Sequence, residues 1–278
     1  MRSMDHLVLP VSDLEIARTR LQSLGFTVAA NGRHPFGTEN ACVFLPDKTY
    51  LEPLAVADPA EAEDAIAHGN LFVARDRFFR QHRAEGLSAI VVQSDDAFAD
   101  REAFTAAGVG EGGDILEFSR PVRLPDGQER ISSFRLAFAI DPLVETFFLF
   151  ACQRLNPLSV DRDVLEKHAN GALGVKRILI QTGQNNYQAL MTPVFGCASR
   201  EITNGQAFDA GNTSVEVVVG NDANIGIIVL ALVFTVADLE VTAAALAANG
   251  VSHVRTQDEI VVPAAPGQGV TFLFEENA

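Results

Sequence analysis

The sequence has few cysteines, and their number is odd. Cys42, Cys152 and Cys197 are the three cysteines of the 278-residue chain. A disulfide-stapled secreted scaffold needs more of them, in even numbers. The sequence therefore favours a reducing compartment, and we expect a cytoplasmic protein.

Basic residues and long hydrophobic segments are also scarce. Lys and Arg number 21 against 36 Asp and Glu, which gives a formal net charge of −15. Such a charge repels phosphate backbones and anionic lipid, so we expect no nucleic-acid partner. The longest apolar run, residues 225–237, is shorter than the roughly 18 to 20 residues that span a bilayer. The N-terminal residues also lack the apolar core of a signal peptide, so we expect no membrane partner.

What the sequence does contain is a repeated β-α-β-β-β pattern. In the first copy, strands are predicted over residues 6–11, 26–28, 41–45 and 49–56. The helix between the first two strands starts after Asp13, an N-cap residue, and stops at Gly25, a typical C-cap glycine. Aspartate and glycine recur at the same spacing as Asp96 and Gly108 and as Asp238 and Gly250. Such periodicity predicts the architecture directly.

A further copy opens with a strand at residues 177–181, followed by a helix near 186–194 and extended segments to 219. We therefore predict an α+β fold of four degenerate βαβββ modules that form paired-module, half-barrel-like sheets. Residues 1–154 are predicted to hold modules 1 and 2, and residues 172–278 modules 3 and 4. A helical insert at residues 58–86 interrupts the first half. Its arginines, from Arg75 to Arg83, are expected on a solvated helix face.

Three segments of the first module carry a resemblance to a known family. They are Asp5-His6-Leu7-Val8, the segment His-Pro-Phe-Gly-Thr-Glu-Asn at 34–40, and Tyr50-Leu51-Glu52. With the tandem modules, they resemble the vicinal oxygen chelate superfamily, which includes glyoxalase I, extradiol dioxygenases and antibiotic-resistance proteins. Residues 4–56 are most similar to glyoxalase-like proteins of unassigned activity.

This resemblance implies a divalent metal between paired modules, with one ligand from the first strand and one from the last strand of each. Zn, Mn, Fe or Ni suits imidazole and carboxylate ligands. The metal would polarise a carbonyl or enediolate, or bind a catecholate together with dioxygen.

Only the first module keeps both of the implied ligands, His6 and Glu52. The corresponding positions of the other modules are Ala89 and a residue near Leu149, Arg177 and Glu216, and Ala231 with Leu273 or Phe274. Since no pair of modules supplies four ligands, a complete glyoxalase I site is not expected. Arg177 and Glu216 are expected to form a structural ion pair instead.

Two interpretations remain open for the first-module residues. His6 and Glu52 are either metal ligands or a buried histidine satisfied by a carboxylate. His34 or Glu145 could add a third ligand, and His34 is preferred. His34, Thr38 and Asn40 either bind a small ligand or serve turn chemistry. Without a metal, Glu52 could be the catalytic general base, with a pKa raised by burial.

Together these features predict a glyoxalase-like enzyme of the lyase, isomerase or dioxygenase type that acts on a small oxygen-rich metabolite. The alternative is a metal-free protein that binds or sequesters a small molecule, as bleomycin-resistance proteins do. A homodimer is compatible with either function.

Overall fold

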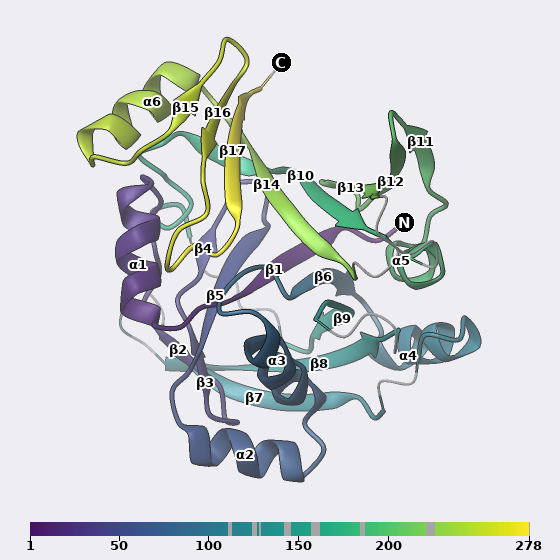
Figure 1. The fold of residues 1–278 in the computed structure, drawn as a ribbon. Helices are drawn as coiled ribbons and strands as arrows, with labels where there is room; N and C mark the ends of the chain where they lie inside the picture. The colour runs from purple at the N-terminus through teal and green to yellow at the C-terminus, as the bar shows by residue number, and fades with distance from the viewer. Residues whose placement is uncertain are drawn as a thin grey trace.

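The computed structural model describes residues 1–110, 113–123, 127, 129–141, 146–156, 162–183, 187–220 and 226–277. Four βαβββ modules follow one another along the chain (Figure 1). The predicted fold is therefore confirmed. In the part of the chain that is described, no helix is long and apolar enough to cross a membrane.

The first two modules are separated by the helical insert. Module 1 comprises β1 (Met4–Pro10), α1 (Leu14–Ser23), β2 (Gly32–Arg33), β3 (Thr38–Asn40), β4 (Val43–Phe44) and β5 (Tyr50–Val56). The insert forms α2 (Pro59–Ala67) and α3 (Leu71–His82). Module 2 comprises β6 (Ala89–Ser94), α4 (Ala97–Ala106), β7 (Leu116–Arg123), β8 (Glu129–Ala139) and β9 (Phe148–Arg154).

The last two modules repeat the order without an insert. Module 3 comprises β10 (Ala172–Thr182), α5 (Tyr187–Phe195), β11 (Arg200–Ile202), β12 (Gly205–Asp209) and β13 (Ser214–Val219). Module 4 comprises β14 (Ile228–Val236), α6 (Leu239–Ala248), β15 (Val254–Arg255), β16 (Glu259–Val262) and β17 (Thr271–Glu276).

Each pair of modules shares one sheet. The strand order is β2-β3-β5-β1-β6-β9-β8-β7 in the first sheet, where β4 also pairs with β5. In the second sheet it is β11-β12-β13-β10-β14-β17-β16-β15. The first strands of the two modules, β1 with β6 and β10 with β14, pair antiparallel at the centre of each sheet. Modules 1 and 2 therefore contact each other along β1 and β6.

The repeated aspartates start the helices as predicted. The carboxylates of Asp13, Asp96 and Asp238 each accept hydrogen bonds from two backbone N–H groups of the first helical turn. These bonds satisfy amides that the helix itself cannot pair.

Two hydrophobic cores lie on opposite sides of the first sheet. Leu7 and Leu9 of β1 belong to a core that also contains Ile178 and Ile180 of β10, so this core joins the two sheets. Val8, between them in sequence, points to the other side, as strand geometry requires. There it packs in a second core with Phe72 of α3.

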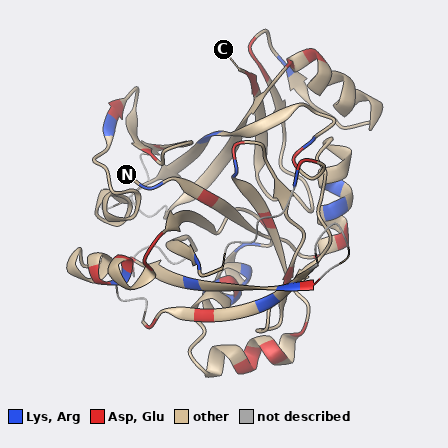
Figure 2. Cartoon of the chain, turned by 180° about the vertical axis from the view of Figure 1, so that it is seen from behind, with Lys and Arg blue, Asp and Glu red and all other residues tan. Residues whose placement is uncertain are grey.

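Helices α2 and α3 cover this second face of the first sheet (Figure 1). The acidic residues of α2, such as Glu61 and Glu63, face solvent (Figure 2). The prediction of a solvated arginine face is confirmed for the exposed Arg77 but is wrong for Arg80. Arg80 pairs with the buried Asp76 and donates to the carbonyls of Val11 and Leu54. These hydrogen bonds connect α3 to the C-terminal parts of β1 and β5.

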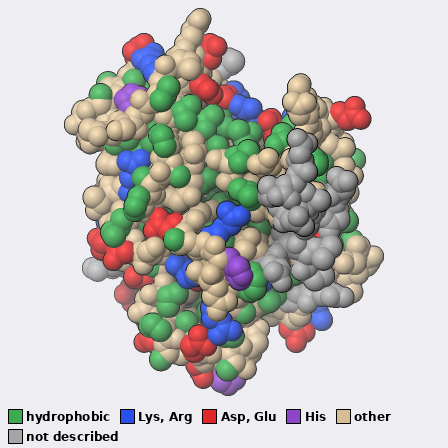
Figure 3. Space-filling view, in the orientation of Figure 1, with side chains coloured by type: hydrophobic (Ala, Val, Ile, Leu, Met, Phe, Trp, Pro, Cys, Tyr) green, Lys and Arg blue, Asp and Glu red, His purple; other side chains and the backbone are tan. Residues whose placement is uncertain are grey.

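The corresponding face of the second sheet is more exposed. Leu179 and Leu273 are half-buried there, and hydrophobic side chains gather at the surface over β10, β14 and β17 (Figure 3).

The predicted strand at residues 26–28 is wrong, because the edge strand of module 1 is β2. Phe26 packs against His168 and Phe234 of the second half. Its hydrophobic character therefore reflects contact between the halves rather than a strand. The predicted strand at 41–45 is reduced to β4, and β3 precedes it.

Candidate active site in the first sheet

His6 projects from β1 and is held by a buried carboxylate. Its Nδ1 lies 2.6 Å from Oδ1 of Asp5, which is 2% exposed. Arg154 at the end of β9 in turn donates two hydrogen bonds to Asp5, one of them 2.7 Å long. Because an ionised carboxylate only accepts, Nδ1 of His6 carries a proton and donates it to Asp5.

Glu52 projects from β5, the strand parallel to β1, and lies opposite Val8 in the register. Its Oε2 is 3.4 Å from Nε2 of His6. Its Oε1 accepts a 2.5 Å hydrogen bond from Nδ2 of Asn40 on β3. The carboxylate is 5% exposed and therefore lies within the sheet's covered face.

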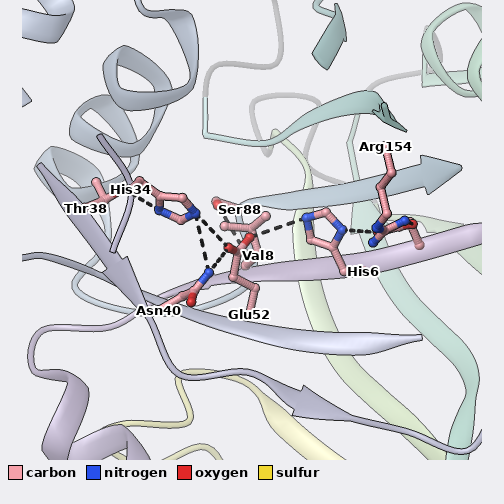
Figure 4. Close-up of polar contacts among 9 residues, drawn as sticks. His6, Val8, His34, Thr38, Asn40, Glu52, Ser88 and Arg154 are labelled. Atoms are coloured by element: carbon pink, nitrogen blue, oxygen red, sulfur yellow. Dashed lines mark hydrogen bonds and ion pairs between the residues drawn. The ribbon is translucent and has the colours of Figure 1, made fainter. Parts of the chain in front are cut away.

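His34 approaches Glu52 from the opposite side to His6 (Figure 4). It precedes β3, and its Nδ1 makes a 2.9 Å hydrogen bond with Oγ1 of Thr38. Its Nε2 lies 3.6 Å from Oε1 of Glu52 and 3.5 Å from Nδ2 of Asn40. All five predicted site residues, His6, His34, Thr38, Asn40 and Glu52, are thus brought together. Glu145 lies outside the described residues.

The two histidines differ in protonation. Burial alone would lower the pKa of His6, but its contacts with Asp5 and Glu52 outweigh burial and raise that pKa above its ordinary value. Burial lowers the pKa of His34 to about 4, and the charge of Arg120 adds to this effect. At neutral pH His34 is therefore a neutral imidazole, whereas His6 favours the imidazolium.

Glu52 is ionised. Burial is the largest single influence and favours its neutral form, but the contacts with His6, His34 and Asn40 together outweigh burial and lower the pKa to about 2. The expectation that this pKa is raised is wrong, because these contacts together stabilise the carboxylate more than desolvation destabilises it.

The types of donor atom at this site are suited to a divalent metal. Two imidazole nitrogens and one ionised carboxylate are a common ligand set for transition metals, and a carboxylate bound to Nδ1–H, as Asp5 is here, is the usual support of a metal-binding imidazole. Within the described residues, however, no group of three or more His, Cys, Asp and Glu side chains is arranged as a metal site. The Nε2 proton of His6 occupies the contact with Glu52, and a metal would have to replace it.

A small aromatic cavity opens beside these residues, with a volume of about 30 Å³, and it widens into an open mouth. Phenylalanines from three regions line it: Phe36 and Phe72 from module 1 and the insert, and Phe118, Phe134 and Phe150 from module 2. Arg120 and Cys152 also line it. Burial raises the pKa of the Cys152 thiol, so this cysteine is a poor nucleophile.

Sequence reasoning missed the contribution of module 2. Phe118 and Arg120 on β7 alternate with exposed residues, and so point to one face. This alternation was the available signal for cavity residues on β7. Arg154 gave no local signal, because only the pairing of β6 with β9 brings it to Asp5.

The other modules lack the His6–Glu52 pair, as predicted. Strand register places Phe150, rather than Leu149, at the position in module 2 that matches Glu52. In module 3, Arg177 forms the predicted ion pair with Glu216 at 3.4 Å and a second one with Glu275. The polar site therefore belongs to module 1, and module 2 supplies mainly its apolar wall.

Comparison with solved structures shows the same fold in proteins of low sequence identity. A hypothetical protein from Staphylococcus aureus aligns over 100% of both chains with a TM-score of 0.70 and 14% identity. A mutant 4-hydroxymandelate synthase from Streptomyces coelicolor aligns over 99% of this chain and 92% of its own, with a TM-score of 0.62 and 14% identity. The Mn(II)-bound glyoxalase from Novosphingobium aromaticivorans aligns over 99% and 83%, with a TM-score of 0.57 and 8% identity.

No curated protein matches the sequence. The family model for a glyoxalase-like domain matches residues 4–193, which include all of modules 1 and 2. This match confirms the resemblance to glyoxalase-like proteins, and the structural neighbours share the fold. The chain belongs to the glyoxalase-like domain family.

Proposed function

We propose that the protein is a glyoxalase-like enzyme of the lyase, isomerase or dioxygenase type that acts on a small oxygen-rich metabolite. His6, Glu52 and His34 would hold a divalent metal, Zn, Mn, Fe or Ni. The observation that carries the proposal is the approach of two imidazole Nε2 atoms to the two oxygens of one ionised, buried carboxylate. The metal, when bound, would polarise a carbonyl or enediolate oxygen of the substrate.

The surrounding residues prepare the donor atoms. Asp5 fixes the ring of His6 through Nδ1, so that Nε2 points at Glu52. Thr38 orients the ring of His34 through Nδ1, and the low pKa keeps this imidazole neutral. Asn40 orients Glu52 by donating to Oε1. The low pKa of Glu52 favours a ligand over a general base, and a direct contact of Thr38 or Asn40 with substrate stays a prediction.

A metal-free binding protein is the second candidate function. It is favoured by Ala89 and Phe150, which stand where module 2 would otherwise supply ligands. In that case the His6–Glu52 contact would be the permanent ion pair that satisfies both groups, and the aromatic cavity alone would select the ligand.

Metal content separates the two candidates. Protein purified without a polyhistidine tag would be offered each metal in turn, dialysed and analysed by mass spectrometry. We expect near-stoichiometric metal in the wild type and in His68→Asn, a control at an exposed histidine, and loss of metal in His6→Asn and Glu52→Gln. Absence of metal from reconstituted wild type would refute the metal-dependent enzyme.

A further inference from the structure

Arg120 lines the cavity, and nothing assigned so far uses its charge. It projects from β7 into the aromatic cavity, where its Nε is buried without a hydrogen-bond partner. Among the described residues, no carboxylate lies within ion-pair distance of its guanidinium. A buried N–H without a partner costs free energy, and a charged one costs more. This side chain is therefore prepared for a partner that comes with a ligand.

The chain makes room for this guanidinium. Gly32 on β2 lies opposite Asn40 in the register of β2 and β3. A Cβ at Gly32 would collide with Nη1 of Arg120, and it would lie 2.7 Å from Oδ1 of Asn40. Arg120 therefore rests on the bare backbone of Gly32, beside the amide that holds Glu52.

Aromatic rings surround the same point. The Cζ atom of Arg120 lies 6.0 Å from the ring centre of Phe134, and Phe134 stacks on Phe118 at 5.1 Å. Phe118 in turn meets the ring of Phe36 at 5.1 Å and that of His34 at 5.8 Å. A continuous aromatic wall thus leads from the guanidinium to the candidate metal ligands.

These contacts define the chemistry of a ligand. A guanidinium pairs best with a carboxylate, whose two oxygens match its planar fork. Phenylalanine walls favour a flat aromatic body through edge and face contacts. An uncharged carbonyl could accept a hydrogen bond from Nε but would leave the charge of the guanidinium unpaired, and a saturated ring would lose part of the aromatic contact.

We propose that the mouth of the cavity binds an aromatic carboxylate, with its carboxylate on Arg120 and its ring against the half-exposed Phe118 and Phe134. This inference rests on the proposed function in taking the cavity as the ligand site, and it names the class of substrate. The part of the ligand next to its carboxylate would then lie beside Asn40 and Glu52, where the proposed chemistry occurs.

The test compares phenylacetate with its uncharged isostere phenylacetamide and with cyclohexylacetate, by calorimetric titration of chelator-treated protein. We expect phenylacetate to bind at least tenfold more tightly than phenylacetamide, because the amide cannot form the charged pair. We also expect it to bind more tightly than cyclohexylacetate. Equal affinity for acid and amide, or no binding of any probe at millimolar concentration, would overturn the proposal. Equal affinity for the two acids would overturn its aromatic part.

Amino-acid substitutions test whether Arg120 binds the carboxylate of the ligand. In Arg120→Met the preference for acid over amide should disappear, and in Gly32→Ala it should weaken, because the added methyl displaces the guanidinium. Arg135→Met is the matched control, since Arg135 lies on the neighbouring β8 and pairs with Glu117 outside the cavity. A preference that survives in Arg120→Met would refute the assignment. Should that variant fail to fold, Gly32→Ala and the wild-type comparison still decide.

The chelator-treated arm separates this inference from the proposed function. An Arg120-dependent preference for the acid supports the inference even if the protein never binds a metal. A protein that binds metal but shows no such preference keeps the proposed function and loses the inference.

Discussion

Breaking the Asp5–Arg154 pair tests whether the site depends on a buried network. Asp5 is 2% exposed, whereas the Arg154 side chain is 31% exposed. Replacing Asp5 by Asn leaves a guanidinium that water can partly reach, so we expect a loss of about 3 kcal/mol in the free energy of unfolding, the low end for a broken buried pair. Replacing Arg154 by Met leaves a carboxylate that water cannot reach, and we expect about 4 kcal/mol.

The double variant separates pairing from packing. The loss of the Asp5–His6 contact is common to Asp5→Asn and to the double variant, so it cancels from the comparison. With both charges of the Asp5–Arg154 pair removed, the double variant should lose less than the sum of the single losses, by about 2 kcal/mol. Urea unfolding followed by circular dichroism at neutral pH measures all four proteins. Neutral pH is required because the pKa of Asp5 is lowered in the folded state. Its stabilising contribution is therefore complete above the unfolded pKa of 3.8 and is lost as the pH falls through the lower folded value.

Additivity would refute the reasoning. If the double variant loses the sum of the single losses to within about 0.5 kcal/mol, the two groups act independently. Arg154 would then not be the partner that stabilises the buried carboxylate of Asp5. A coupling that disappears at high salt would indicate a solvent-exposed pair, contrary to the burial of Asp5.

Three further predictions follow from the same site. In chelator-treated protein, the pKa of His34 is about 4 in the folded state against 6.5 for an ordinary histidine. The unfolded chain therefore binds more protons between these values, so stability should fall by about 3 kcal/mol as the pH falls from 6.5 to 4. His34→Gln should remove this dependence in urea unfolding, and an unchanged pH profile would contradict the assigned protonation. Metal binding should release about one proton, because His6 must lose its Nε2 proton. Titration calorimetry in buffers of different ionisation enthalpy measures the number of protons released, and zero release would contradict the prediction. Phe72→Ala should cost about 3 to 5 kcal/mol in unfolding free energy, because the ring is 4% exposed between α3 and the first sheet; a loss below about 1 kcal/mol would show that α3 packs elsewhere.

The sequence alone determined the modules and the polar half of the site. Helix starts at Asp13, Asp96 and Asp238 depend on carboxylates that bond backbone groups two and three residues away, so they can be identified from local spacing. His6 and Glu52 could be paired through the family resemblance, which implies one ligand from the first strand and one from the last strand of a module. The helix starts are local signals, and the tertiary structure preserved them.

Tertiary structure alone decided the wall of the cavity and the electrostatics. Arg120 and Arg154 reach the module 1 site through the pairing of β6 with β9, of β9 with β8 and of β8 with β7. Register decided that Phe150, and not Leu149, faces the site, because a shift of one residue reverses the face of a strand. The pKa of Glu52 falls because His6 lies within contact, and that distance is set by the packing of two strands some 40 residues apart in sequence, which no local pattern encodes.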